Sequence, residues 1–91
     1  MKELRRFWLT LEKSTKPTAL NLGCGVTAFD YADAVALVRD RLFGGQTMPP
    51  IRERIADVTL SALDSKHVLP NIGKVDVRGI WFPRGFEEPT P

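Results

Sequence analysis

The sequence is poor in the side chains that carry chemistry. Its 91 residues include one cysteine, Cys24, and one histidine, His67. A single cysteine cannot form an intrachain disulfide, so a reducing cytoplasm is the expected setting. One cysteine and one histidine also cannot complete a structural zinc site, and the carboxylates lack the spacing typical of metal ligands. We therefore expect neither a metal nor a cofactor.

Long apolar runs and concentrated charge are also missing. No apolar stretch approaches the ~20 residues that span a bilayer, so we expect no membrane association and no signal peptide. Thirteen basic and eleven acidic residues are interspersed along the chain and leave a net charge of +2. Nucleic-acid-binding proteins usually gather their cations on one face. The mixture favours a solvated surface.

The length bounds the architecture, because 91 residues suffice for one small core. We expect a single α+β domain over residues 1–84 and a flexible C-terminal tail over residues 85–91. The expected fold is a small antiparallel or mixed sheet of three to four strands packed on one main helix. The expected order is β-β-α-β-short α-β.

Two alternating patterns predict the first strands. Apolar Phe7, Leu9 and Leu11 alternate with Trp8, Thr10 and Glu12, which is the period of a half-buried strand. Over residues 20–27 one face holds Leu20, Leu22, Cys24 and Val26, and the other face holds Asn21, Gly23, Gly25 and Thr27. Glycines on one face allow a large side chain, such as a tryptophan, to lie against the sheet.

The main helix is predicted over residues 31–43. Asp30 is a good N-cap, Asp33 adds a favourable charge near the helix N-terminus, and Gly44 suits a left-handed C-cap. The second half of the chain is less regular. A short strand is predicted at 57–60, although residues 51–62 also show helical spacing. A brief helix should open at Ser61, and residues 75–82 should be β-rich, with a bulge at Gly79.

The glycine segment over residues 20–27 resembles the cofactor loop of Rossmann-type S-adenosylmethionine methyltransferases. It departs from that motif at Asn21, where an acidic residue is usual, and at Thr27, where the third glycine should stand. The remaining chain is too short for several βαβ units of ~30 residues each. We therefore interpret the segment as a strand and predict that S-adenosylmethionine does not bind.

Residues 23–31 and 79–83 together resemble a group of small, uncharacterised bacterial proteins. The likeness covers most of the chain and implies a bacterial, cytosolic, stand-alone protein, but it implies no activity. Many proteins of this kind are immunity proteins or regulatory inhibitors, which is an inference by association.

The catalytic inventory is small. A general base needs a positioned partner, and Asp64 and Ser65 are the nearest candidates for His67. A lone histidine in a short helix is typical of a capping or surface residue. Cys24 lies on the apolar face of its predicted strand, where a thiol usually acts as an inert small hydrophobe. The sequence therefore predicts no catalytic residues and no enzyme.

Aromatic residues and arginines supply the candidate partner-binding site. Exposed tryptophan beside arginine is typical of binding hot spots, so we select Trp8, Arg78, Trp81 and Arg84. The adjacent Trp81 and Phe82 should point to opposite sides of their strand. Alternatively, the short second helix, the Pro49-Pro50 loop or the tail covers the tryptophans. In that case the polar helix face around Asp33, Arg39 and Asp40 becomes the candidate.

Three functions remain open. The leading hypothesis is a non-enzymatic protein-binding module, a bacterial immunity protein or an inhibitor of a neighbouring effector. The second is a nucleic-acid-binding accessory protein that uses Trp8 or Trp81 for stacking and arginines for phosphate, namely Arg5, Arg6, Arg78 and Arg84. The third is a small enzyme or ligand-binding protein that uses Cys24 and His67.

Overall fold

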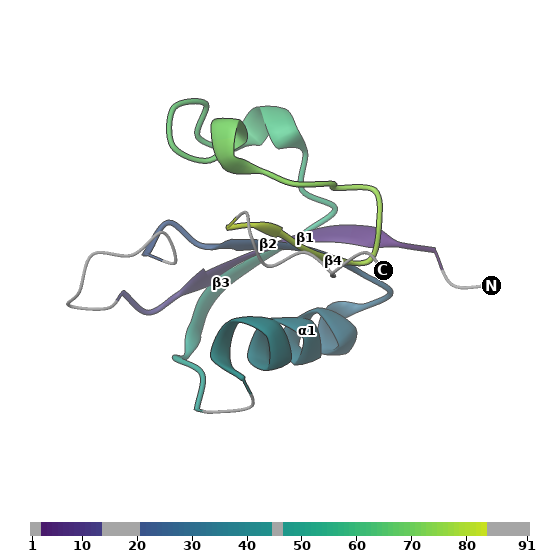
Figure 1. Cartoon of the computed structure of the whole chain (residues 1–91), viewed down its shortest axis with the longest axis vertical. Coiled ribbons are helices and arrows are strands. Elements are labelled where there is room, and N and C mark those ends of the chain that lie inside the picture. Colours follow the sequence, from purple (N-terminus) through teal and green to yellow (C-terminus); the bar gives the residue numbers. More distant parts are fainter. Residues whose placement is uncertain (1–2, 14–20, 45–46, 84–91) are drawn as a thin grey trace.

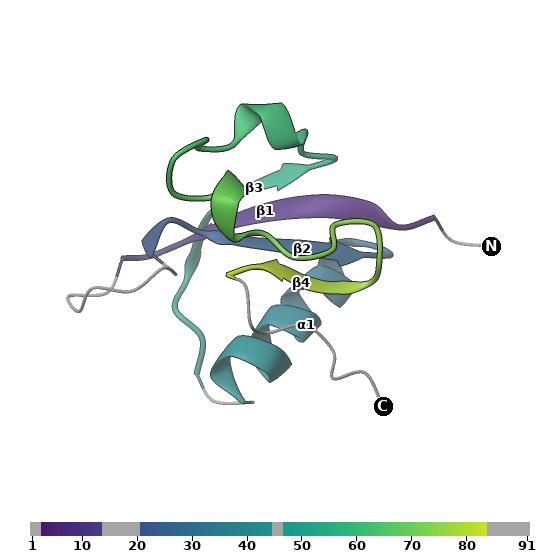
Figure 2. The same ribbon diagram turned by 45° about the horizontal axis from the view of Figure 1, so that its top comes forward.

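A four-stranded antiparallel sheet and one helix form the framework of the protein. The computed structural model describes residues 3–13, 21–44 and 47–83. Its elements are β1 (Arg5–Leu11), β2 (Cys24–Ala28), α1 (Tyr31–Phe43), β3 (Ile51–Ala56), the short 3-10 helices η2 (Leu60–Ala62) and η3 (Leu69–Asn71), and β4 (Gly79–Phe82). The strand order is β3-β1-β2-β4, as Figure 2 shows. The predicted α+β class and order of elements are confirmed.

The sheet is covered on both faces, which gives three layers (Figure 1). The helix α1 packs on one face, where it meets Phe7, Leu9, Leu11, Cys24, Val26, Ala28 and Ile80. The segment 57–78, which contains η2 and η3, lies over the other face. There it covers a second cluster that contains Trp8, Val58, Val68, Trp81 and Phe82. We call these clusters the helix-side core and the far-side core.

The helix has the predicted bounds, and its ends explain why. Asp30 Oδ1 accepts a hydrogen bond from the Asp33 amide at 2.8 Å, and Asp33 Oδ2 accepts one from the Phe29 amide at 3.1 Å. These contacts satisfy amides that have no partner inside the helix. At the other end Gly44 has φ 57°, and its amide donates to the carbonyl of Arg39. Glycine adopts this left-handed conformation without steric cost.

Two predicted strand positions are wrong. The third strand is Ile51–Ala56, not residues 57–60, because Asp57 has φ 54° and turns the chain out of the sheet. Val58 then enters the far-side core. The second strand begins at Cys24 rather than at residue 20, since Gly23 has φ 125° and Leu22 is exposed. Leu20 lies outside the described residues.

The last strand also differs from the prediction, in length and in the position of its bulge. It covers Gly79–Phe82 only, and in its pairing with β2 Gly25 lies opposite Phe82 while Val26 lies opposite Ile80. Trp81 is therefore the extra residue of the bulge, not Gly79. The bulge breaks the alternation, so Trp81 and Phe82 both enter the far-side core instead of pointing to opposite sides.

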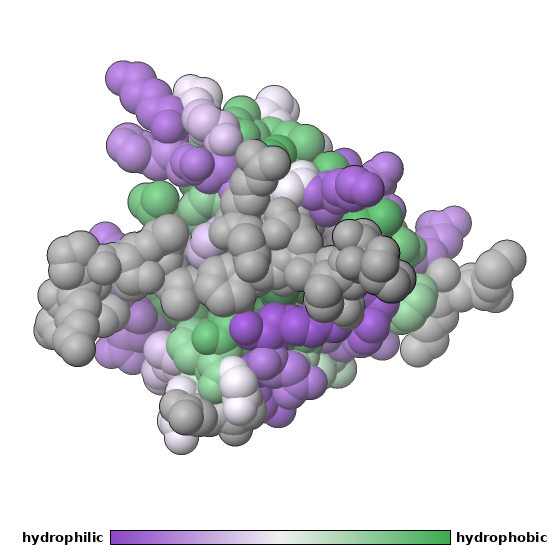
Figure 3. Space-filling view, viewed as in Figure 1, coloured by the Kyte–Doolittle hydropathy of each residue, from purple (hydrophilic) through white to green (hydrophobic). Residues whose placement is uncertain are grey.

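Two further predictions concern short or terminal segments. The expected brief helix at Ser61 is the three-residue 3-10 helix η2. The predicted tail, residues 85–91, lies outside the described residues, as does Arg84. Over the visible face of the described part, hydrophobic and hydrophilic residues are interspersed, in keeping with the mixed charge of the chain (Figure 3).

Candidate functional site

Both tryptophans of the predicted binding site are buried. Trp8 is 7% exposed and Trp81 is 0% exposed. Their ring centroids lie 6.0 Å apart, and the Phe82 ring lies 5.5 Å from that of Trp8. Of the two alternatives for the tryptophans, the covered one holds: the segment 57–78, which includes the short helix η2, lies over this face of the sheet. The two rings belong to the core of the fold and are not available to a partner.

The glycine motif explains how these rings fit. A Cβ atom on Gly23 would lie 2.7 Å from Cζ2 of Trp8, and a Cβ atom on Gly25 would overlap the ring of Trp81. Both contacts would be closer than any normal carbon contact, so only glycine allows the two indoles to approach the backbone at these positions. The expectation that these glycines accept tryptophan is confirmed, although Gly23 lies just before the strand and only Gly25 lies within it.

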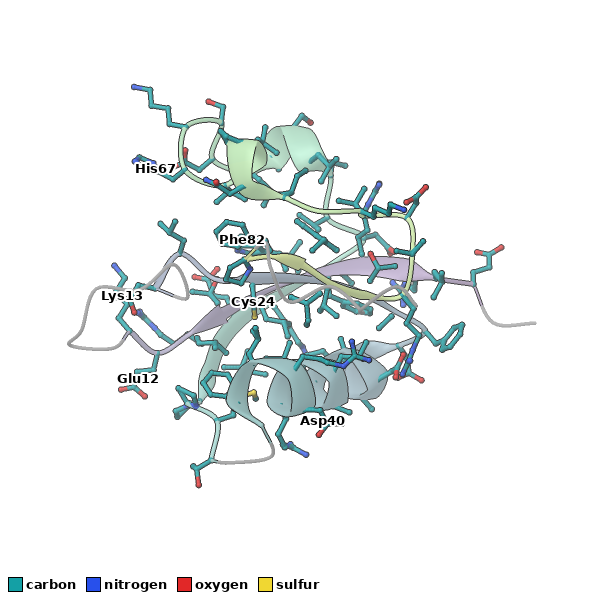
Figure 4. All side chains as sticks on the ribbon, viewed as in Figure 1. Glu12, Lys13, Cys24, Asp40, His67 and Phe82 are labelled. Carbon is teal, nitrogen blue, oxygen red and sulfur yellow. The ribbon has the colours of Figure 1, made fainter. Side chains whose placement is uncertain are left out.

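Cys24 and His67 lie in different layers (Figure 4). Cys24 is fully buried in the helix-side core, and its Sγ donates a weak hydrogen bond to the carbonyl of Leu9 at 3.5 Å. Burial raises the pKa of this thiol from 9.0 to about 12. At neutral pH the thiol is protonated, and a protonated thiol is a poor nucleophile.

His67 is an exposed residue of the segment that covers the far side. Its Nδ1 lies 3.2 Å from Oδ2 of Asp64, and the other oxygen of Asp64 accepts from the amides of Lys66 and His67. The His67 amide, then the Lys66 amide and the His67 ring, hold the pKa of Asp64 below its usual value. In these contacts the Asp64 side chain caps a turn over residues 64–67. The contacts do not bring His67 to Cys24.

Three exposed apolar side chains lie near one end of the sheet. Because the strands are antiparallel, the start of β1, the end of β2 and the start of β4 meet there. Leu4 is 41% exposed, Phe29 39% and Val77 49%. Leu4 and Phe29 adjoin β1 and β2, and Val77 lies two residues before β4. We call Leu4, Phe29, Val77 and the neighbouring Arg78 the sheet-end surface. Scattered exposed apolar residues are ordinary, but a set at one place marks a candidate contact surface.

Two ion pairs flank the sheet-end surface. Arg5 donates to both carboxylate oxygens of Asp57, at 2.9 and 2.6 Å, which joins β1 to the turn after β3. Arg78 donates to both oxygens of Asp33, with Nε 2.9 Å from Oδ2, which joins the approach to β4 to the start of α1. The Arg78 guanidinium also lies 5.7 Å from the Phe29 ring centroid.

The ion pair of Arg5 has an electrostatic consequence. Its hydrogen bonds hold the pKa of Asp57 below the usual value, so this carboxylate is charged at neutral pH. A hollow opens beside the pair, and the Thr27 hydroxyl that lines it donates to the carbonyl of Val75 at 2.6 Å. Polar and apolar side chains both line this hollow, among them Thr27, Leu4 and Val75.

The structure retains only part of the predicted site. Arg78 lies at the surface, Trp8 and Trp81 lie inside the far-side core, and Arg84 is outside the described residues. On the alternative helix face Arg39 and Asp40 are exposed, while Asp33 is bound to Arg78.

Sequence reasoning missed Leu4, Phe29 and Val77. Val77 falls inside the β-rich run predicted over residues 75–82, whereas the strand starts at Gly79. The sequence does carry one signal for Phe29, which directly precedes the N-cap Asp30. A side chain at this position is exposed unless it packs against a residue of the first helical turns.

Within the described ranges, no three histidine, cysteine, aspartate or glutamate side chains come together as a metal site. None of the helices described is long and apolar enough to cross a bilayer. Comparisons with family models, with curated proteins and with solved structures found no match for this chain. The resemblance to small bacterial proteins therefore stays a prediction, and the function has to be argued from the geometry.

Proposed function

We propose that this chain is a non-enzymatic protein-binding module that contacts its partner through the sheet-end surface. The observation that carries the proposal is the combination of three exposed apolar side chains with the flanking pairs Arg5–Asp57 and Arg78–Asp33. Protein interfaces commonly have an apolar centre, a polar rim and an enrichment in arginine. Because each ion pair joins two elements, the arginines are held in place before the partner arrives, which lowers the entropic cost of binding.

The geometry supports protein binding more than nucleic-acid binding. The tryptophans that would stack on bases are buried, and two of the four arginines considered for phosphate contacts, Arg5 and Arg78, are bonded to aspartates. Binding a phosphate would require breaking those pairs or accepting the nearby negative charge. The buried, protonated thiol of Cys24 likewise gives no support to a cysteine-dependent enzyme.

The finer proposal is an immunity protein or an inhibitor of a neighbouring effector that acts in a bacterial cytoplasm. Its support is the small size, the single reduced cysteine and the lack of a catalytic arrangement around Cys24 and His67. Such a module acts by occupying a surface of its target, for which a small rigid fold is sufficient.

The test measures binding of the purified chain to the products of the genes beside its own. The double variant Leu4→Ser, Phe29→Ser should bind about 30-fold more weakly, which corresponds to the hot-spot threshold of about 2 kcal/mol. Leu22→Ser is the matched control, because Leu22 is 42% exposed but precedes β2 and so lies at the opposite end of the sheet. Its affinity should stay within about twofold of the parent.

Two results would contradict the proposal. One is equal loss of affinity in the double variant and in Leu22→Ser. The other is tight binding to DNA or RNA with an affinity that falls steeply with salt, since that slope reports phosphate contacts.

A further inference from the structure

The strand β3 is an open edge of the sheet. It pairs with β1 on one side only, and five of its six residues are exposed. The described residues give β3 no backbone hydrogen bond on its outer side. The opposite edge strand differs, because the carbonyl of Trp81 in β4 accepts from the amide of Gly73 at 2.7 Å. An unpaired row of amides and carbonyls is a template for an added strand.

The register assigns the β3 side chains to the two faces. Arg54 lies opposite Leu9, so it shares the helix side, whereas Ile55 lies opposite Trp8, on the far side. The Arg54 guanidinium lies 4.3 Å from the ring centroid of Tyr31, the first residue of α1, and lines a shallow groove with Arg5. Ile55 is 45% exposed. The edge therefore presents a held cation on one face and an apolar side chain on the other.

The positive charge of Arg54 indicates which side chain an added strand would carry at this edge. Arg54 has no carboxylate partner among the described residues, while Arg5 in the same groove is bonded to Asp57. The Tyr31 ring keeps the Arg54 guanidinium at the mouth of the groove through a cation–π contact. An acidic side chain on an added strand would lie beside this guanidinium.

A second copy of the chain is disfavoured in the central registers of the edge. Two copies paired antiparallel are related by a two-fold axis perpendicular to the sheet, so the pairing is centred on a residue. A centre at Glu53 places Glu53 opposite Glu53 and Arg52 opposite Arg54. A centre at Arg54 places two Arg54 side chains opposite each other. Like charges directly opposite destabilise strand pairing, so these two central registers are disfavoured. A centre at Ile55 places two Ile55 side chains opposite each other, and a second copy in that register is an outcome that the test distinguishes.

We propose that β3 accepts an extended segment of another protein, which adds a fifth strand to the sheet. The segment carries an acidic residue beside Arg54 on the helix side and an apolar residue beside Ile55 on the far side. This surface adjoins the sheet-end surface at Arg5, but its test uses different variants. Failure of one proposal therefore leaves the other standing.

The test uses synthetic eight-residue peptides and the full ¹⁵N-labelled chain. One peptide alternates valine with aspartate, the second alternates valine with lysine, and the third is the acidic peptide with every backbone amide N-methylated. The acidic peptide should shift the amide resonances of residues 51–56. The lysine peptide and the methylated peptide should not, since the first has the wrong charge and the second cannot donate to a strand.

Charge reversal at Arg54 sharpens the test. Arg54→Glu should weaken binding of the acidic peptide about tenfold and allow the lysine peptide to bind. Arg39→Glu, at an exposed position of α1, is the control for net charge and should change affinity less than about twofold. If Arg54→Glu does not fold, Arg54→Gln supplies the same comparison.

Three results would overturn the proposal. The first is the absence of shifts at residues 51–56 with the acidic peptide. The second is equal weakening by Arg54→Glu and Arg39→Glu, which would show general electrostatic attraction only. The third is a concentration-dependent change of the same resonances without peptide, which would make a second copy the occupant.

Discussion

The two faces of the sheet are covered by different kinds of structure. On the helix side a regular helix supplies apolar residues at helical spacing, and the core is mostly aliphatic. On the far side an irregular segment with two short 3-10 helices supplies scattered apolar residues, and large aromatic side chains from the sheet fill the space. An irregular cover is therefore sufficient when the strands beneath it carry tryptophan and have glycine where the tryptophan rings approach the backbone.

The largest expected loss of stability comes from truncating one large side chain in each core. Trp81→Ala should lower the free energy of unfolding by about 3–5 kcal/mol, as truncation of a buried aromatic residue does. Leu37→Ala, in the helix-side core, should cost a similar amount, about 2–5 kcal/mol. Denaturant unfolding measures both. A cost below about 1 kcal/mol for Trp81→Ala would show that the far side is only loosely attached to the fold.

Trp81→Phe separates packing from hydrogen bonding at the same position. The indole Nε1 of Trp81 is buried and has no acceptor among the described residues. Replacement by phenylalanine therefore removes no hydrogen bond and should cost clearly less than Trp81→Ala.

The second prediction concerns the close approach of backbone and ring on the far side. Gly25→Ala should destabilise the protein by about 1–3 kcal/mol, because the added methyl group overlaps the Trp81 ring. In the Trp81→Ala background the same change should cost much less, since the ring is gone. Additive costs in this double-mutant cycle would contradict the proposed contact.

The third prediction tests the helix side through the thiol. Cys24→Ala should cost about 1 kcal/mol through lost packing. The unfolded thiol ionises near pH 9.0, whereas the folded thiol keeps its proton up to about pH 12. The unfolded state therefore releases a proton first, and the stability due to Cys24 falls as the pH rises from about 9 to about 12.

The measurement is unfolding of the parent and of Cys24→Ala across this alkaline range. The stability of the parent relative to Cys24→Ala should fall steadily as the pH rises through this range. A constant difference would contradict a buried thiol, and rapid reaction of the parent with a thiol reagent at neutral pH would contradict it as well.

The smallest effect is expected at the outer surface of the far side. Asp64 accepts hydrogen bonds from the segment around His67, and its pKa is lowered from 3.8. Its contribution is present above pH 3.8 and is lost as the pH falls through the lowered value. Asp64→Asn should make stability slightly less dependent on pH in acid. An unchanged acid profile would show that this exposed turn contributes nothing measurable.

The helix side was more predictable from the sequence than the far side. The bounds of α1 follow from Asp30 and Gly44, and the first strand follows from strict alternation, because both signals are local. The position of β3 could not be predicted. The strand ends because Asp57 adopts a left-handed conformation, and this position has an aspartate instead of the glycine that usually signals such a turn. The bulge at Trp81 arises from pairing with β2, which is a non-local contact.

The candidate site was predictable only in part. Arg78 was identified, but the sheet-end surface is assembled from Leu4, Phe29 and Val77, which are far apart in the sequence. Their meeting depends on antiparallel register and strand order. The burial of Trp8 likewise depends on the segment 57–78, whose sequence has no sustained helical or strand periodicity from which its position could be predicted.

The segment that covers the far side is fastened to the sheet near both of its ends. The Val58 amide donates to the carbonyl of Arg6 at 3.1 Å, and the Gly73 amide donates to the carbonyl of Trp81 at 2.7 Å. A loop held at both ends cannot swing open about a single hinge. Because the entropy of closing such a loop grows slowly with its length, a few residues inserted among the exposed positions 64–67 should lengthen the turn without releasing the two fastened ends.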